Sequence, residues 1–149
     1  MALASQFVML APERRALAFN QTAARMSASP VMVEKDFWVS WILGLLFDDD
    51  ALVPHLVFKG GTALSKVYGV IDRFSEDIDL SMSPAFIGAD EAFFDSIKSR
   101  TRRDTEIARM QMECGARTRD VLMPQLEARI AERRPNDIGL GNCPSAMRR

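Results

Sequence analysis

The sequence predicts a single α+β domain in which helix-rich N- and C-terminal parts enclose a short strand-forming region. The chain has 149 residues and is 48% hydrophobic, which is enough for one core and too little for two domains. Apolar residues recur at helical spacing before residue 48 and after residue 88. Between them, residues 55–59 and 77–82 form two runs of strand length. We therefore treat residues 1–149 as one domain.

The N-terminal third is predicted to be helical. Residues 1–28 mix apolar and polar side chains at loose helical spacing, which indicates one or two short helices. Ser29 and Pro30 supply the N-cap and first helical position of a helix that runs to about Phe47. Its apolar residues make a broad face that we expect in the core: Val33, Phe37, Trp38, Trp41, Ile42, Leu45 and Leu46.

Three consecutive carboxylates, Asp48, Asp49 and Asp50, follow this helix before Pro54. Such a run at the end of a helix is typical of a solvated turn, and a cation site is the alternative. The solvated turn is the interpretation that we favour.

A strand, a glycine turn and a helix come next. Residues 55–59 are an apolar run that leads into Gly60, Gly61 and Thr62, followed by a helix-forming run at 63–68. Adjacent glycines let the backbone approach a ligand closely, and the amides at a helix start favour phosphate. A turn that merely connects two elements is the alternative. The later glycine and Lys-Ser/Thr of the common phosphate-binding loops are missing.

Paired carboxylates mark the second strand, predicted over residues 77–82. Its alternation places Asp77 and Asp79 on one face and turns the intervening apolar residues toward the core. Two such carboxylates repel each other unless a cation lies between them. Oxygen ligands favour Mg²⁺ or Mn²⁺ over zinc, with phosphate oxygens completing the coordination. A charged edge strand is the alternative.

The C-terminal part is predicted to be helical over residues 88–134, with Pro124 near the start of the last helix and a loose tail at 135–149. Two apolar stripes are expected to face the core: Ala92, Phe93 and Ile97, and then Leu122, Leu126 and Ile130.

The charges are unevenly distributed. Residues 1–97 hold 7 Lys/Arg and 13 Asp/Glu, whereas residues 98–149 hold 12 and 7. The basic half indicates an anionic partner such as nucleic acid, and arginines on solvated helix faces are the alternative.

Other features limit the class of protein. No apolar run reaches the 18 residues that a bilayer span requires, and the N-terminus lacks the pattern of a secretory signal. We therefore expect a cytoplasmic protein without a membrane partner. Cys114 and Cys143 match no zinc or redox spacing.

The segment FKGGTALSKVYGVIDRFSEDIDLS is similar to the signature of the nucleotidyltransferase superfamily, a glycine turn followed by a paired-aspartate strand. More narrowly, the chain resembles the AbiEii toxin family of nucleotidyltransferases, which also carries a stretch like VEKDFWVSWILGLLF. The resemblance covers residues of about 31–85. Phosphatases of the haloacid-dehalogenase type and some glycosyltransferases also use Asp-x-Asp. The first would need a buried strand where DRFSE stands, and the second does not explain the glycine turn.

The resemblance implies a mixed sheet flanked by helices and a metal-dependent transfer of a nucleotidyl group, in a toxin of a toxin–antitoxin or abortive-infection system. Asp77 and Asp79 would be catalytic and coordinate Mg²⁺ (or Mn²⁺). The implied partners are a nucleoside triphosphate, a cognate antitoxin, and an RNA acceptor such as tRNA. The residues expected to bind the nucleotide are Lys59, Gly60, Gly61, Thr62, Ser65 and Arg73.

The chain departs from this family because related proteins are longer and carry further acidic positions. No third carboxylate can be assigned among Glu106, Glu113, Asp120 and Asp137. We therefore expect a truncated chain. The alternative function is a non-catalytic remnant or interaction module that binds a partner protein or RNA. His55, the only histidine, is interpreted as a turn residue rather than a general base.

Overall fold

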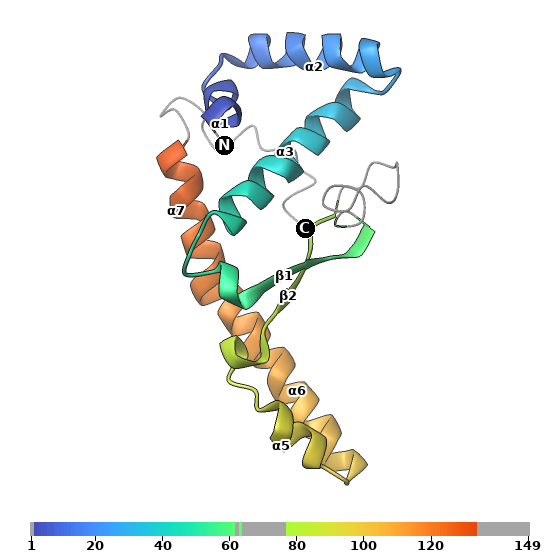
Figure 1. The fold of residues 1–149 in the computed structure, drawn as a ribbon, viewed down its shortest axis with the longest axis vertical. Helices are drawn as coiled ribbons and strands as arrows, with labels where there is room; N and C mark the ends of the chain where they lie inside the picture. The colour runs from blue at the N-terminus through green and yellow to red at the C-terminus, as the bar shows by residue number, and fades with distance from the viewer. Residues whose placement is uncertain (1, 62, 64–76, 134–149) are drawn as a thin grey trace.

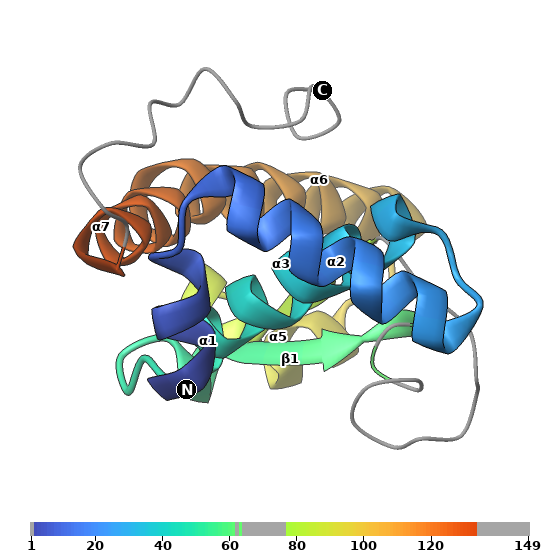
Figure 2. The same cartoon turned by 90° about the horizontal axis from the view of Figure 1, so that it is seen from above.

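The computed structural model describes residues 2–61, 63 and 77–133. Helices α1 to α3 lie at one end of an elongated molecule, a two-stranded sheet lies in the middle, and a long helical rod runs along it (Figure 1). Figure 2 shows this rod along one side, β1 along the opposite side, and α3 between them. Helix-rich ends around a central sheet agree with the predicted α+β class. In the part of the chain so described, no helix has the length and apolar character needed to cross a bilayer.

Three helices form the N-terminal part: α1 (Ala2–Val8), α2 (Pro12–Met26) and α3 (Pro30–Phe47). Both predictions for this region are confirmed, although the Ser29 side chain makes no capping hydrogen bond. Arg15 of α2 is 9% exposed. Its Nη1 donates to the carbonyl oxygens of Val8 at 2.9 Å and Leu10 at 2.7 Å. The end of α1 is thereby satisfied by a side chain of α2.

The apolar face predicted for α3 is the centre of the core. Trp41, Leu45 and Leu46 are buried, and Trp41 and Leu45 pack with Val8 of α1. Rings of the three helices meet near Phe37, whose ring packs edge to face on Phe7 with centroids 4.8 Å apart. The apolar periodicity of α3 therefore identified three of its buried residues but missed Val39, which is 4% exposed.

The sheet consists of β1 (Leu56–Lys59) and β2 (Asp79–Met82), paired antiparallel so that Leu56 lies opposite Met82 and Lys59 opposite Asp79. Its inner face packs on a buried cluster formed by α3, the turn after it and the rod, with Leu46, Leu52, Leu56 and Leu122. Among the described residues the sheet contains this antiparallel pair, whereas a mixed sheet was expected.

Both strands are shorter than predicted. His55 belongs to η1 (Val53–His55), a 3-10 turn with Pro54 at its start. Strand β1 ends at Lys59, because the chain turns at Gly60, where φ is +76°. Lys59 pairs with Asp79, so the ladder begins at Asp79, and Asp77 lies before it, outside β2. The period-two argument for the aspartate pair therefore applies to Asp79 and not to Asp77.

The C-terminal part is helical, as predicted. It comprises η2 (Pro84–Ile87), α5 (Glu91–Ser96), α6 (Arg100–Arg117), the π-helical segment η3 (Thr118–Leu122) and α7 (Met123–Arg133). The last three form one continuous rod (Figure 1).

The two stripes predicted for this part have different outcomes. Leu122 is buried, and Leu126 and Ile130 pack against the core, so the second stripe is confirmed. The first is wrong for Ala92, which is exposed, and for Phe93, which is 41% exposed, although Ile97 is buried. Helix α5 ends at Ser96, and the neighbouring Phe94 faces α6 instead.

The acidic turn after α3 is solvated at Asp48 and Asp50, which are exposed, but not at Asp49. Asp49 is 6% exposed, and its carboxylate forms an ion pair with Arg129, whose Nε lies 2.7 Å from Asp49 Oδ2. Arg133 binds the Asp48 carboxylate at 3.0 Å. Two arginines of α7 thus fasten the rod to the end of α3.

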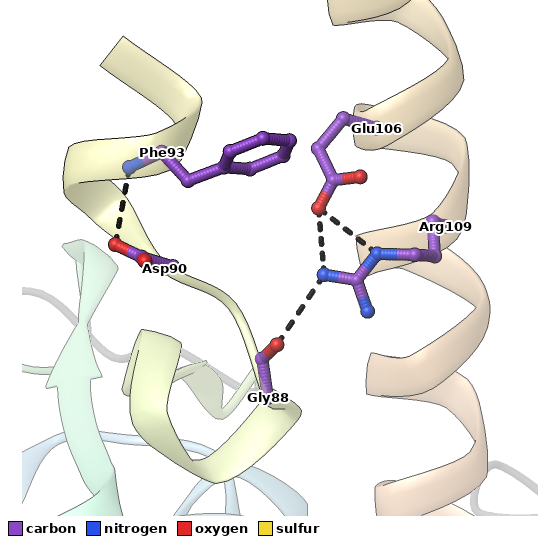
Figure 3. A network of polar contacts seen from close by, with 5 residues as sticks. All are labelled: Gly88, Asp90, Phe93, Glu106 and Arg109. Atoms are coloured by element: carbon purple, nitrogen blue, oxygen red, sulfur yellow. Dashed lines mark hydrogen bonds and ion pairs between the residues drawn. The ribbon is translucent and has the colours of Figure 1, made fainter. Parts of the chain in front are cut away.

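A second polar network fastens the segment after β2 to α6 (Figure 3). Arg109 donates from Nε and Nη2 to Glu106 at 2.9 and 2.6 Å, and from Nη2 to the Gly88 carbonyl at 3.3 Å. Asp90 accepts from the Phe93 amide at 3.1 Å and so caps α5. The hydrogen bond from Arg109 lowers the pKa of Glu106 below its ordinary value of 4.5.

We expect Arg129→Leu to lower the free energy of unfolding by about 2–4 kcal/mol, because it leaves the buried Asp49 carboxylate without its cation. The matched change Arg133→Leu removes a pair whose Asp48 side chain is 49% exposed, and should cost about 1 kcal/mol or less. Urea denaturation measures both. Equal losses would contradict the different roles assigned to the two arginines.

The carboxyl of Glu106 should titrate below pH 4.5 in the folded protein, and Arg109→Gln should return its pKa toward that value. Because the folded pKa is lowered, the contribution of this pair to stability is complete above pH 4.5 and is lost as the pH falls through the folded pKa. Carbon-detected NMR titration measures the shift. Unchanged titration in the variant would exclude Arg109 as its cause.

Candidate nucleotide and metal site

The candidate site lies where β1 ends and β2 begins. Lys59 and Asp79 are directly opposite each other in the ladder and both are exposed. Side chains alternate along strands, so these two share the outer face of the sheet with Val57 and Ser81. The inner face is held in the core, and the position of the charged pair is therefore fixed by the packing beneath it.

Gly60 lies against the carboxylate of Asp79. Its φ of +76° is a conformation that other L-residues rarely adopt. A Cβ at this position would overlap Asp79 Oδ2 and would lie 2.9 Å from Asp79 Cγ. Only glycine satisfies both the turn and this approach. The glycine turn and the aspartate strand, 19 residues apart in sequence, are thus one structural unit.

The chain becomes helical directly after β1, whereas the predicted helix began at residue 63. Gly60, Gly61 and Ala63 are helical, and Ala63 is 4% exposed. Three of the residues predicted to bind nucleotide, Thr62, Ser65 and Arg73, lie outside the described residues, as does the rest of the helix predicted to 68.

Asp77 is exposed and comes two residues before Asp79. No cluster of three or more His, Cys, Asp or Glu side chains occurs among the residues that the structure describes. Two exposed carboxylates nevertheless fit Mg²⁺, which is commonly held by one or two protein carboxylates while phosphates and water fill the remaining positions. They do not fit zinc, which takes nitrogen and sulfur ligands in closed sites.

The other acidic candidates are bound elsewhere. Each pairs with an arginine nearby on the rod: Glu106 with Arg109, Glu113 with Arg117, and Asp120 with Arg119. Asp137 lies outside the described residues.

His55 is remote from the site because it stands at the other end of β1. Its Nδ1 lies 3.3 Å from Ser83 Oγ, and its ring stacks on Phe86 with centroids 4.7 Å apart. This arrangement agrees with the turn role predicted for it.

The position of Lys59 opposite Asp79 is a feature that the sequence did not reveal. Lys59 was expected to contact phosphate, but the strand register that places it beside an aspartate follows from where the turn at Gly60 ends β1. The apolar alternation of the two strands was the available signal, and it leaves the register open by two residues in either direction.

Comparison with known protein families matches this chain to a family model. The family model described as AbiEii, "Nucleotidyl transferase AbiEii toxin, Type IV TA system", matches residues 42–134. This range contains both strands, the glycine turn and the rod. No curated protein and no solved structure matches the chain.

Gly60→Ala should destabilise the fold by about 2–4 kcal/mol, because it combines left-handed backbone strain with the overlap on Asp79. Gly88→Ala is the matched control, since Gly88 also has positive φ, +62°, but has nothing within 4 Å of an added Cβ. It should cost only the strain, about 1–2 kcal/mol. Denaturant titration distinguishes the two. A Gly60 variant no less stable than the Gly88 variant would contradict the contact with Asp79.

Proposed function

This chain belongs to the AbiEii family of nucleotidyl transferase toxins, and we propose that it transfers a nucleotidyl group from a nucleoside triphosphate with Mg²⁺ (or Mn²⁺) held at Asp77 and Asp79. The observation that carries the proposal is the contact between Gly60 and the Asp79 carboxylate. On this proposal, the β1–β2 ladder belongs to the mixed sheet of a nucleotidyltransferase.

The contact supports the proposal because it joins two binding elements of complementary chemistry. Backbone amides at a glycine turn that opens a helix favour phosphate oxygens. Carboxylates bind the divalent cation that accompanies a triphosphate. With the α-carbon of Gly60 against Asp79, phosphates at the turn would lie beside the metal-binding carboxylates.

Some residues of the site would position the nucleotide, and others would neutralise its charge. Gly60 and Gly61 would hold the phosphates, and Lys59 would neutralise part of their charge. A cation bound at the carboxylates would stabilise the charge that develops on the pyrophosphate. We include Thr62, Ser65 and Arg73 in the nucleotide site on the resemblance of the sequence alone.

The reaction on this proposal is an in-line displacement at phosphorus. The oxygen of an acceptor hydroxyl forms a bond to the α-phosphorus, and the bond from this phosphorus to the bridging oxygen of pyrophosphate breaks. The electron pair of that bond leaves with pyrophosphate, and the hydroxyl proton passes to water. Positioning and charge stabilisation supply most of the catalysis in reactions of this kind.

Family membership implies, in general terms, an antitoxin partner and a nucleoside triphosphate substrate. We propose that the acceptor is RNA, such as tRNA. The support is the basic half of the chain, residues 98–149, with 12 Lys/Arg against 7 Asp/Glu.

Nucleoside triphosphate with Mg²⁺ should raise the thermal midpoint of the chain by about 2–4 °C for each kcal/mol of binding energy, and Asp77→Asn and Asp79→Asn should each abolish the rise. Differential scanning fluorimetry against each of the four triphosphates, with and without Mg²⁺, measures this. Labelled transfer to tRNA would follow with the triphosphate that stabilises best.

Asp95→Asn is the matched control, because it removes an exposed carboxylate of the same type from α5. It should respond to Mg²⁺ and triphosphate as wild type does. If all four proteins respond alike, or none responds although all are folded, the enzyme proposal fails. The interaction-module alternative would then take its place.

A further inference from the structure

We propose that the junction of α5 and α6 is a docking surface for the sugar-phosphate backbone of RNA. We call it the α5–α6 surface, and it consists of Phe93, Lys98, Arg100, Arg102 and Arg103. It deepens the proposed function, since RNA held here would be the acceptor, but binding at this surface does not require transfer. Its support comes from charge pairing, helix electrostatics and ring contacts.

The cations of this surface are not used in ion pairs. Within the described part of the chain, Lys98, Arg100 and Arg102 have no carboxylate within 4 Å, and all three are exposed. Arg103 Nη2 donates to the Ile97 carbonyl at 3.2 Å. Further along the rod, by contrast, five arginines pair with acids: Arg109, Arg117, Arg119, Arg129 and Arg133.

Ion pairs do not account for these charges, although Arg103 donates to the Ile97 carbonyl and the charge of Arg102 helps to lower the pKa of Glu106. Arg100, Arg102 and Arg103 fill the first turn of α6, which contains no acidic residue. The N-terminal end of a helix carries partial positive charge and favours acids there. Arginines in this turn are therefore repelled by the positive end of the helix dipole and add to the positive electrostatic potential there. Such a potential attracts an anionic ligand.

Aromatic rings accompany the cations. The Arg102 guanidinium lies 5.6 Å from the centroid of Phe93, and that of Arg103 lies 5.4 Å from the centroid of Phe94. Phe93 remains 41% exposed. Exposed rings beside arginines are the combination with which proteins bind single-stranded nucleic acid, since bases stack on the rings while cations contact phosphates. An acidic protein partner would need the cations but not the ring.

The acids of this region do not cancel the surface. Asp90 accepts the Phe93 amide and Glu106 is bound by Arg109 (Figure 3). Asp95 and Asp104 are exposed, and neither forms an ion pair with a cation of the α5–α6 surface. Figure 1 shows β1 across the middle of the molecule and the start of α6 at the end of the molecule away from α1 to α3.

The test uses the double variant Lys98→Gln/Arg100→Gln and the matched control Arg14→Gln/Arg25→Gln, which removes the same charge from exposed positions of α2. The probe is a fluorescein-labelled single-stranded RNA of about 16 nucleotides. Anisotropy is measured over a series of salt concentrations in EDTA without nucleotide. Failure of the nucleotide site therefore does not affect the result.

Lys98→Gln/Arg100→Gln should weaken RNA binding about fivefold or more and lower the slope of log Kd against log salt by about 1.4, because two phosphate contacts are lost. Its thermal midpoint should equal or exceed that of wild type, since repulsion at the start of α6 is relieved. Phe93→Ala should weaken binding about fivefold or more through lost stacking. The control variant should leave Kd and slope unchanged.

Three outcomes would overturn the proposal. The first is the absence of RNA binding by the wild-type chain at about 0.15 M salt. Equal weakening by the two double variants would show that binding follows total charge and not this surface. Tighter binding of DNA of the same sequence would exclude RNA as the partner.

Discussion

The contact among Leu46 of α3, Leu56 of β1 and Leu122 of η3, closed by Leu52, is the interaction on which the rest of the structure depends. A two-stranded ladder is marginally stable in water without other support. Here its inner face is held by the helix before it and the rod after it. The buried Asp49–Arg129 pair secures the same junction from its polar side. The candidate site, at the outer end of the ladder, takes its position from this packing.

Local signals account for the part of the fold that the sequence predicted correctly. Pro30 begins α3 and the periodicity of its apolar residues identifies its buried face. The apolar run before Gly60 gives β1, and the glycines give the turn. These signals act through neighbours in the chain, so a single sequence contains them. The candidate residues Gly60 and Asp79 are brought into contact, and Lys59 lies opposite Asp79.

Features that depend on distant partners were predicted poorly. The partners of Asp48 and Asp49 lie on α7, some 80 positions further on. No local sequence pattern near the acidic turn predicts this pairing. The length of β2 depends on where β1 ends, and the exposure of Phe93 depends on how α5 meets α6. In each case tertiary contacts decide between alternatives that are locally equivalent.

The arginines separate into those that the fold explains and those that it does not. Arg15 satisfies the carbonyls that end α1, and Arg129 neutralises a buried carboxylate. The arginines in the first turn of α6 are repelled by the positive end of the helix dipole. The exposed carboxylates at 77 and 79 likewise carry like charges close together in the sequence. Places where side chains act against local stability are commonly functional sites, which is the reason for proposing a ligand at each. On the two proposals the ligands differ in the sign of their charge: a cation for the carboxylates, and an anionic RNA chain for the arginines.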